Sequence, residues 1–288
     1  MKKSKQKGFE KLVLNIERAF CYLLLIMLSV LCLFSFYVLI INTTRSHPDI
    51  QKGFSLVPGK SFLINLNNLL NNAQLPVLSG IANSLIVSTG AAVLATYFSA
   101  LTAFAIHAYD FRFKKYAFGF IMVIMMIPTQ VSALGFVKLM SDMGLMNSFI
   151  PLTVPAIASP IIFFFMRQYM QSAMPMDLVE AARIDGAREF RIFNQIVLPI
   201  MKPAIAVQAI FTFVSSWNNY FIPALLLNKD SKKTLPILIA QLRSADFLKF
   251  DMGQVYMLIG LAILPVIVVY LILAKNIVAG ITLGSVKG

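Results

Sequence analysis

The feature that most constrains this chain is a series of long apolar segments separated by short polar ones. A helix that crosses a lipid bilayer needs about 20 consecutive, largely apolar residues, and the sequence contains six windows that approach or exceed this length. The windows carry essentially no Asp, Glu, Lys or Arg, although prolines interrupt the fourth. They span residues 19–41, 81–106, 116–137, 149–166, 204–227 and 255–274. This pattern predicts six transmembrane helices.

Composition and charge favour a membrane protein over a soluble one. Of the 288 residues, 58% are hydrophobic and only 13% are charged, about half the ~25% of an average soluble domain. The net charge of +13 raises the alternative of nucleic-acid binding. The basic residues are, however, divided among short segments between the apolar windows, where they act as topology signals. We therefore expect an all-α integral membrane protein in contact with lipid, with no nucleic-acid partner.

The distribution of Lys and Arg predicts the orientation of the spans. With six spans, both termini lie on one side of the membrane, together with residues 107–115 and 167–203. That side holds sixteen Lys plus Arg and the other side nine, so the positive-inside rule places both termini in the cytoplasm. The basic N-terminus resembles the start of a signal peptide. Its apolar stretch is too long for one, and no small-residue cleavage site follows, which indicates an uncleaved anchor.

Residues that carry chemistry are missing from the apolar windows. Ion-coupled secondary transporters usually keep an ionisable residue in mid-membrane, and the windows contain essentially none. The sequence has no glycine-rich phosphate-binding loop, and neither His47 nor His107 has a ligand cluster beside it. Cys21 and Cys32 are too far apart on one helix for a disulfide. We predict a non-catalytic chain without metal or cofactor, whose energy for transport comes from a partner.

A short charged stretch, VEAARIDGAREF, stands between the fourth and fifth windows. Pro175 suits the first turn of a helix, and Gly186 suits its end, where glycine adopts a left-handed conformation at least cost. An i, i+3, i+4, i+7 spacing places side chains on one helix face. Here that face consists of Leu178, Ala181, Ala182 and Asp185. We expect a short cytoplasmic helix that fits a groove on another protein; an ordinary interfacial linker is the alternative.

The same stretch resembles the EAA signature of permease subunits in ATP-binding-cassette (ABC) importers. That signature has E-A-A, then D-G-A, then I-x-L-P, and here the three parts are residues 180–182, 185–187 and 196–199. The segment SSWNNYFIPALLL is similar to the carbohydrate-importer branch. The C-terminal segment LAILPVIVVYLILAKNIVAGITLGSVKG is similar to the ending of the maltose-permease G-type subunit. The resemblance extends from about residue 80 to the end.

The resemblance implies a division of labour among several subunits in a bacterial cytoplasmic membrane. Family members form a heterodimer with a second permease subunit and bind two cytoplasmic ATPase subunits, which use ATP and Mg. An extracytoplasmic solute-binding protein delivers the sugar. The EAA loop is the coupling helix, which sits in a cleft of one ATPase. Carried over to this chain, Glu180 would contact the ATPase, Ala181 and Ala182 would allow close seating, and Gly186 would set the following bend.

The resemblance also implies a domain layout. A cytoplasmic tail (residues 1–18) precedes the first transmembrane helix and an extracytoplasmic loop (19–79). The permease core domain follows at 80–278, with the coupling helix between its spans, and a second cytoplasmic tail ends the chain at 279–288. A membrane-anchored receptor or scaffold is the rival function, but the outer loop is too short for a separate domain.

Two segments are candidates for the substrate pathway. Sugars are bound by aromatic faces and hydrogen bonds, which fits the uncharged polar cluster of the fifth window and, more weakly, the residues after the kinking Pro128. The candidates are Trp217, Asn218, Asn219 and Tyr220 in the first segment, and Thr129 and Gln130 in the second. An aromatic belt at a span end is the alternative for the first segment, and satisfaction of proline-freed carbonyls is the alternative for the second.

The identity of the solute stays open at this level. In the importer family the sugar site lies mainly in the partner permease, on the segment that corresponds to residues 217–220 of this chain. Permeases for polyols and glycerol phosphate share the EAA signature, so these solutes are the alternative substrates to a sugar or oligosaccharide.

Overall fold

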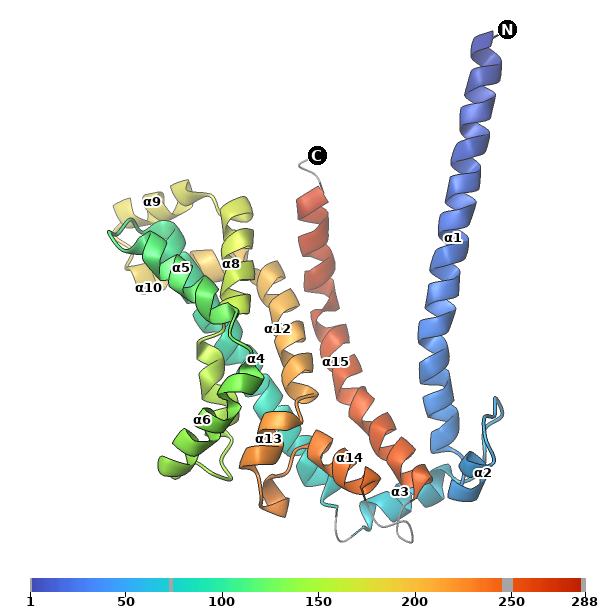
Figure 1. Ribbon diagram of the computed structural model, residues 1–288. Coiled ribbons are helices and arrows are strands. Elements are labelled where there is room, and N and C mark those ends of the chain that lie inside the picture. The colour runs from blue at the N-terminus through green and yellow to red at the C-terminus, as the bar shows by residue number, and fades with distance from the viewer. Residues whose placement is uncertain (1, 73–74, 245–250, 286–288) are drawn as a thin grey trace. The chain divides into compact units, whose positions relative to one another are not determined.

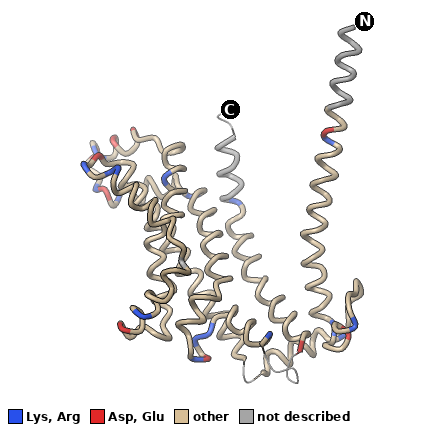
Figure 2. Tube along the Cα trace, viewed as in Figure 1, with Lys and Arg blue, Asp and Glu red and all other residues tan. Residues whose placement is uncertain are grey.

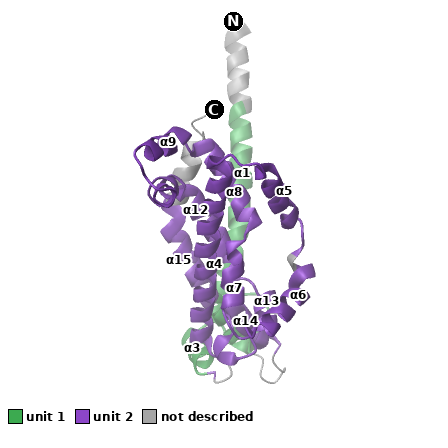
Figure 3. Ribbon diagram, turned by 90° about the vertical axis from the view of Figure 1, so that its left-hand side faces the viewer, with its two compact units in different colours: residues 1–71, 249–260 green, residues 72–248, 261–288 purple. Residues whose placement is uncertain are grey.

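The computed structural model describes residues 2–72, 75–244 and 251–285, with side chains within 14–275 apart from that of Thr129. Every regular element in this part of the chain is a helix, so the all-α prediction is confirmed. Internal contacts divide the chain into two units (Figure 3). Unit 1 comprises residues 1–71 and 249–260, and unit 2 comprises residues 72–248 and 261–288.

Unit 1 contains the first predicted span. Helix α1 (Lys2–Thr43) is continuous, and its part Leu14–Thr43 is long and apolar enough to cross a membrane. The sequence predicted a cytoplasmic tail at 1–18 and a span from 19, and α1 is continuous across that boundary. Two short helices, α2 (His47–Gln51) and α3 (Phe62–Leu70), follow, and the unit also includes the start of α15 (Met252–Ser285).

Buried polar groups order the predicted outer loop of unit 1. Asn65 Nδ2 donates hydrogen bonds to the backbone carbonyls of Thr43 and Arg45, each at 2.9 Å. The guanidinium of Arg45 donates in turn to Asn42 Oδ1 at 3.1 Å and to the carbonyl of Gly53 at 2.9 Å. Buried donors and acceptors are costly when left without partners. The segment is therefore held by paired polar groups.

Helix α4 (Val77–Ala108) is the centre of unit 2 (Figure 1). It packs most extensively against α12 (Lys202–Trp217) and α8 (Pro160–Ala173). Small side chains on a helix let neighbouring backbones approach closely in membrane proteins. The buried positions of α4 include Ala91, Ala92, Ala95, Ala100 and Ala103.

Two spans of unit 2 are sharply bent. α5 (Lys114–Met125) meets α6 (Thr129–Asp142) at 98°, and the helical segment Glu189–Ile200 meets α12 at 80°. Pro128, which cannot donate a backbone hydrogen bond, precedes α6 with an extended backbone. Four further helices are long and apolar enough to span, so the described chain holds up to six candidate spans when each bent pair counts as one. This agrees with the six predicted from sequence.

The bounds of the fourth and fifth spans differ from the prediction. The fourth is composed of α7 (Ile150–Thr153), the 3₁₀ helix η1 (Val154–Ile157) and α8, and it extends to Ala173. The fifth was expected to run through 204–227. Instead α12 ends at Trp217 and α13 (Phe221–Leu226) begins after a break. Asparagine side chains compete with the backbone for hydrogen bonds and disfavour helix interiors, which explains a break at Asn218 and Asn219.

The remaining elements form the connections of unit 2. Asn83 Nδ2 donates to the carbonyls of Ser231 and Lys233, each at 2.9 Å, and so ties the connection before α14 to α4. Charged residues gather at the two ends of the unit (Figure 2), and the α4–α5 turn shares one end with α9 (Met176–Ile184) and α10 (Glu189–Ile192) (Figure 1). These connecting elements are α9 (Met176–Ile184), α10 (Glu189–Ile192), the π-helix η2 (Phe193–Val197), α11 (Leu198–Ile200), η3 (Asp230–Lys232) and α14 (Leu235–Arg243).

Candidate functional site

A helix, α9, lies at the position predicted for the coupling helix. Its N-cap is Pro175, with φ −73° and ψ 118°, so the proline lies one position before the first helical residue rather than within the first turn. Asp177 lies in the first turn and Arg183 in the last, which matches the helix dipole at both ends. Each terminal feature follows from the local sequence.

The C-terminus of α9 is a Schellman motif, as the glycine predicted. Gly186 has a φ of +77°, a conformation that costs other residues energy. Its N–H bonds to the carbonyl of Arg183 at 3.0 Å, and the N–H of Ala187 bonds to the carbonyl of Ala182 at 2.9 Å. This pairing satisfies carbonyls that a helix end otherwise leaves free and stops the helix sharply.

One side of α9 is anchored in the core of unit 2. Val179 is fully buried and Ala182 is 9% exposed, and both belong to a core cluster that includes Met170 and Ile192. The sequence placed Ala182 on the face offered to a partner; the structure turns it inward. The reason is helical geometry, because residues three apart share a side of the helix, and the burial of Val179 therefore carries Ala182 with it.

The opposite side of α9 is free in this chain. Ile184 is 87% exposed and Leu178 is 48% exposed. The other exposed residues of the predicted site are Glu180, Ala181, Asp185 and Gly186. Exposed apolar side chains that gather in a polar setting mark interaction surfaces. Sequence reasoning missed Ile184, although its position three residues after Ala181 was a signal for the same surface.

An ion pair bridges the turn that follows α9. Arg183 Nε lies 2.7 Å from Glu189 Oε1, and Arg183 Nη2 lies 3.3 Å from Glu189 Oε2. The guanidinium carbon of Arg183 also lies 5.2 Å from the centre of the Tyr109 ring, at the end of α4. The hydrogen bond to Glu189 raises the pKa of Arg183 above its ordinary value. The bridge ties α9 to α10 and to the end of α4.

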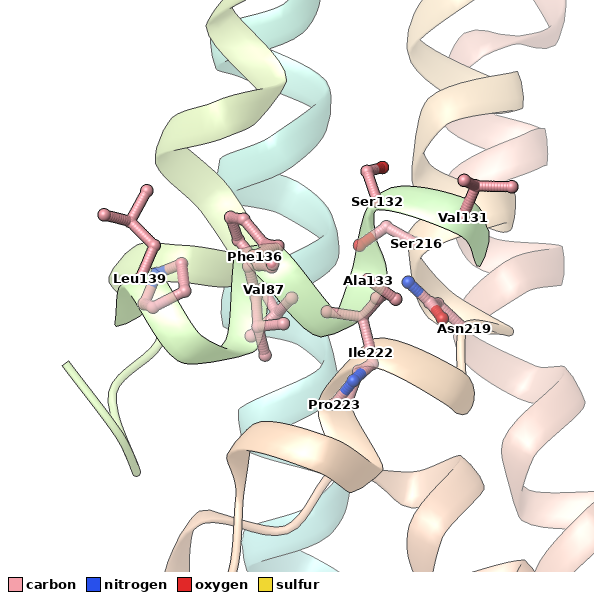
Figure 4. A pocket seen from close by; sticks show the side chains of 13 residues that line it. Val87, Val131, Ser132, Ala133, Phe136, Leu139, Ser216, Asn219, Ile222 and Pro223 are labelled. Atoms are coloured by element: carbon pink, nitrogen blue, oxygen red, sulfur yellow. The ribbon is translucent and has the colours of Figure 1, made fainter. Parts of the chain in front are cut away.

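A cavity of about 620 Å³ lies where α6, α12 and α13 meet. Figure 4 shows Ser216 and Asn219 close to Ser132 and Ala133 of α6 at this cavity. The walls are mainly apolar, with Phe136, Leu139, Ile222 and Pro223 among them. An apolar pocket with a few uncharged polar groups can hold a polar, uncharged solute.

Of the predicted pathway residues, Asn219 is the one that lines this cavity. Trp217 does not: it is 3% exposed, stacks on Phe213 with ring centres 5.7 Å apart, and donates its indole N–H to the carbonyl of Ala262 at 3.1 Å. We therefore correct its assignment from the pathway to the core. Its large apolar ring is stabilised by burial, and its single donor has a partner there.

Three other predicted pathway residues lie nearby but outside the described lining. Asn218 is exposed and caps the end of α12, and Tyr220 is 49% exposed. Gln130 is exposed and directly precedes the cavity-lining Val131. The side chain of Thr129 lies outside the described residues. Sequence reasoning missed Ser132 and Ile222, because only the bend before α6 and the break before α13 bring them to Asn219.

Comparisons with known proteins show the family of this chain. The family model described as "Binding-protein-dependent transport system inner membrane component" matches residues 96–283. The "Arabinooligosaccharides transport system permease protein AraQ" of Bacillus subtilis is 32% identical over 280 residues, which cover 95% of this chain and 97% of that protein. The "Lactose transport system permease protein LacG" of Rhizobium radiobacter is 28% identical and covers 92% and 95%.

Two further proteins are similar to this chain. The "sn-glycerol-3-phosphate transport system permease protein UgpE" of Yersinia pestis is 29% identical over 267 residues, covering 91% of this chain and 95% of that protein. A crystal structure of a bacterial ABC transporter involved in the import of the acidic polysaccharide alginate superposes with a TM-score of 0.77 at 21% identity. That match covers 91% of this chain and 96% of the other, and it shows a shared fold. The chain belongs to the family of binding-protein-dependent transport system inner membrane components.

Proposed function

We propose that this chain is one of two permease subunits of an ATP-driven importer for a sugar or oligosaccharide. The observation that carries the proposal is the build of α9. Its inner side is buried through Val179 and Ala182, while Ala181 and Ile184 project from the outer side. A helix that is fixed to its own core and apolar on the other side is suited to transmit movement from a bound partner.

The partner at α9 is a cytoplasmic ATPase subunit. Two such subunits bind and hydrolyse ATP with Mg, whereas this chain binds neither and catalyses no reaction. Closure of the ATPases moves α9, and the bridge from Arg183 to Glu189 passes the movement to α10 and to the end of α4. Packed elements with discrete arrangements convert a local shift into reorientation of whole helices. The second permease subunit completes the pathway, and an extracytoplasmic solute-binding protein delivers the solute.

A neutral sugar suits the cavity better than glycerol phosphate does. The polar side chains among the described lining residues are Ser132, Ser216 and Asn219, none of which is charged. A phosphate ester calls for Arg, Lys or helix N-terminal donors. The names of the relatives AraQ and LacG, which specify an arabinooligosaccharide and lactose, support the same choice.

Reconstitution of the intact complex tests the proposal. The permease pair, the ATPase and the solute-binding protein are assembled in liposomes, and uptake of radiolabelled arabinooligosaccharide is followed with and without ATP. We expect ATP-dependent uptake that excess unlabelled oligosaccharide blocks and glycerol 3-phosphate does not. If glycerol 3-phosphate blocks uptake and the unlabelled oligosaccharide does not, the substrate is a phosphate ester and not a neutral sugar. Hydrolysis of ATP by this chain when purified by itself would contradict the division of labour.

A further inference from the structure

A second cavity, of about 370 Å³, lies between α4, α5 and the beginning of α8 in unit 2. Its lining is mostly apolar, and Phe120 at its edge is 66% exposed, so the cavity borders the outer surface of the unit. The lining side chains include Thr102, Phe120, Ile121, Ile124, Ile157 and Phe163. In a membrane-spanning protein, an open apolar cavity of this kind faces lipid or another subunit.

Basic side chains lie beyond this cavity on the same three helices. Two are cations, Lys114 at the start of α5 and Arg167 on α8, and the third is the imidazole of His107 on α4. At a rise of 1.5 Å per residue, each lies about 6–9 Å past the nearest lining residue of its helix, toward the predicted cytoplasmic end. His107 is close enough to both cations for their charges to act on its ring.

Phe118 lies between the cavity and Arg167. Its ring centre lies 6.2 Å from that of Phe163, which lines the cavity, and 4.3 Å from the guanidinium carbon of Arg167. The apolar cavity therefore passes directly into a cationic rim, with one aromatic ring shared between them. This is the order of groups along a phospholipid, where acyl chains precede a charged head.

Among the described residues, the charge of the rim is only partly neutralised. Arg167 Nε is buried and has no hydrogen-bond partner among the described residues, and Nη1 reaches Gln171 Oε1 only at 3.4 Å. Lys114 pairs at 3.0 Å with Asp110, whose side chain is fully exposed, and such surface pairs are weak. Unsatisfied buried donors are costly, so an added acceptor with negative charge would stabilise the rim.

We propose that this cavity and rim together bind one anionic phospholipid of the cytoplasmic leaflet. An acyl chain occupies the cavity, and the phosphate accepts hydrogen bonds from Arg167 and Lys114. Arg presents several donors to phosphate oxygens, and basic pockets between spans on the cytoplasmic side are known to recognise anionic head groups. The lipid would join α5 to α8, the helix that leads into α9, and would steady the base of the coupling helix.

Native mass spectrometry of the purified intact complex tests this proposal. Phosphatidylglycerol, phosphatidylcholine with the same acyl chains, and inorganic phosphate are titrated separately. We expect retention of phosphatidylglycerol, little retention of phosphatidylcholine, and no displacement by millimolar phosphate. Equal retention of the two lipids would refute the role of the rim. Displacement by phosphate alone would make the site a free-anion site. A second permease chain that covers the cavity in the complex would abolish lipid binding and also overturn the proposal.

Matched variants separate the rim from the cavity. Arg167→Gln and Lys114→Gln should each weaken phosphatidylglycerol binding about fivefold, since one basic residue near a membrane contributes ~1 kcal/mol. Thr102→Phe tests the cavity, because the larger side chain should fill it and exclude the acyl chain. The controls are Arg191→Gln, an exposed cation elsewhere, and Val93→Phe, on an exposed part of α4. If Arg167→Gln fails to accumulate, Lys114→Gln still tests the rim. Unchanged binding in Lys114→Gln and Thr102→Phe would disprove the site.

Discussion

Arg183 and Glu189 face each other across the turn at Gly186, with Nε 2.7 Å from Oε1 and Nη2 3.3 Å from Oε2. Their side chains are 32% and 44% exposed, and pairs of such exposure contribute roughly 0–1 kcal/mol to stability. The pair therefore matters little for folding. Its two parallel hydrogen bonds instead restrict the angle between α9 and α10.

Loss of this pair should uncouple transport without unfolding the protein. Arg183→Gln and Glu189→Gln should reach normal abundance, because the pair is partly solvated. Hydrolysis by the ATPase subunits should respond less to the loaded solute-binding protein, measured in proteoliposomes. The exchange variant that combines Arg183→Glu with Glu189→Arg should recover part of the response. Full coupling in both single variants would show that the bridge carries no movement.

The backbone at Gly186 should tolerate asparagine but not valine. A left-handed conformation costs a non-glycine residue about 1–2 kcal/mol, and asparagine adopts it more readily. No atom lies within 4 Å of a Cβ placed at Gly186, so the effect would be conformational and not a clash. We expect reduced uptake for Gly186→Val and near-normal uptake for Gly186→Asn. Gly119→Val, which also has open space around it, is the control, and equal activity of all three would contradict the argument.

The two sides of α9 should respond differently to substitution. Ala181→Trp and Ile184→Asp change exposed positions, so the protein should insert normally but lose the ATPase in pull-down. Glu180→Lys should act in the same way through charge repulsion. Ala182→Trp instead adds a large side chain to a position that is 9% exposed, and overpacking typically costs 1–3 kcal/mol. It should lower abundance in the membrane. If the Ile184→Asp variant still captures the ATPase normally, the outer side of α9 is not the surface that binds the ATPase.

Substitution of Trp217 should lower stability, whereas substitution of Asn219 should impair transport. Trp217→Ala removes a stacked and hydrogen-bonded core ring, and such truncations cost about 3–5 kcal/mol, so thermal stability in detergent should fall. Asn219→Ala removes a cavity-lining amide and should raise the KM for uptake at normal thermal stability. A selective transport defect in Trp217→Ala, with unchanged melting, would return the tryptophan to the pathway.

Labelling of single cysteines tests the orientation. The background first replaces Cys21 and Cys32, whose side chains are exposed. A membrane-impermeant maleimide applied to intact cells should modify Ser61→Cys and Ser231→Cys, and it should spare Ser172→Cys until the membrane is opened. The reverse pattern would place α9 outside and exclude contact with a cytoplasmic ATPase.

The sequence by itself determined the class of the protein, the series of up to six candidate spans and the place of α9, the predicted coupling helix. These properties depend on local or additive chemistry. Apolar length decides whether a helix can span, the Lys and Arg balance predicts its direction, and Pro175 and Gly186 mark the ends of α9 through their own backbone preferences. Such properties depend on residues that are close together in the sequence, which is why they could be predicted.

Tertiary structure alone decided which side chains are buried, which are exposed and which line a cavity. The sequence around Ala182 is compatible with placing this residue on either side of α9. Only the packing of Val179 against the core turned the Ala182 side chain inward. Trp217 and Asn219 are two residues apart, yet the end of α12 between them sends one into the core and the other to the cavity. The direction in which a side chain points depends on contacts with residues distant in the chain, and a local sequence pattern does not contain those contacts.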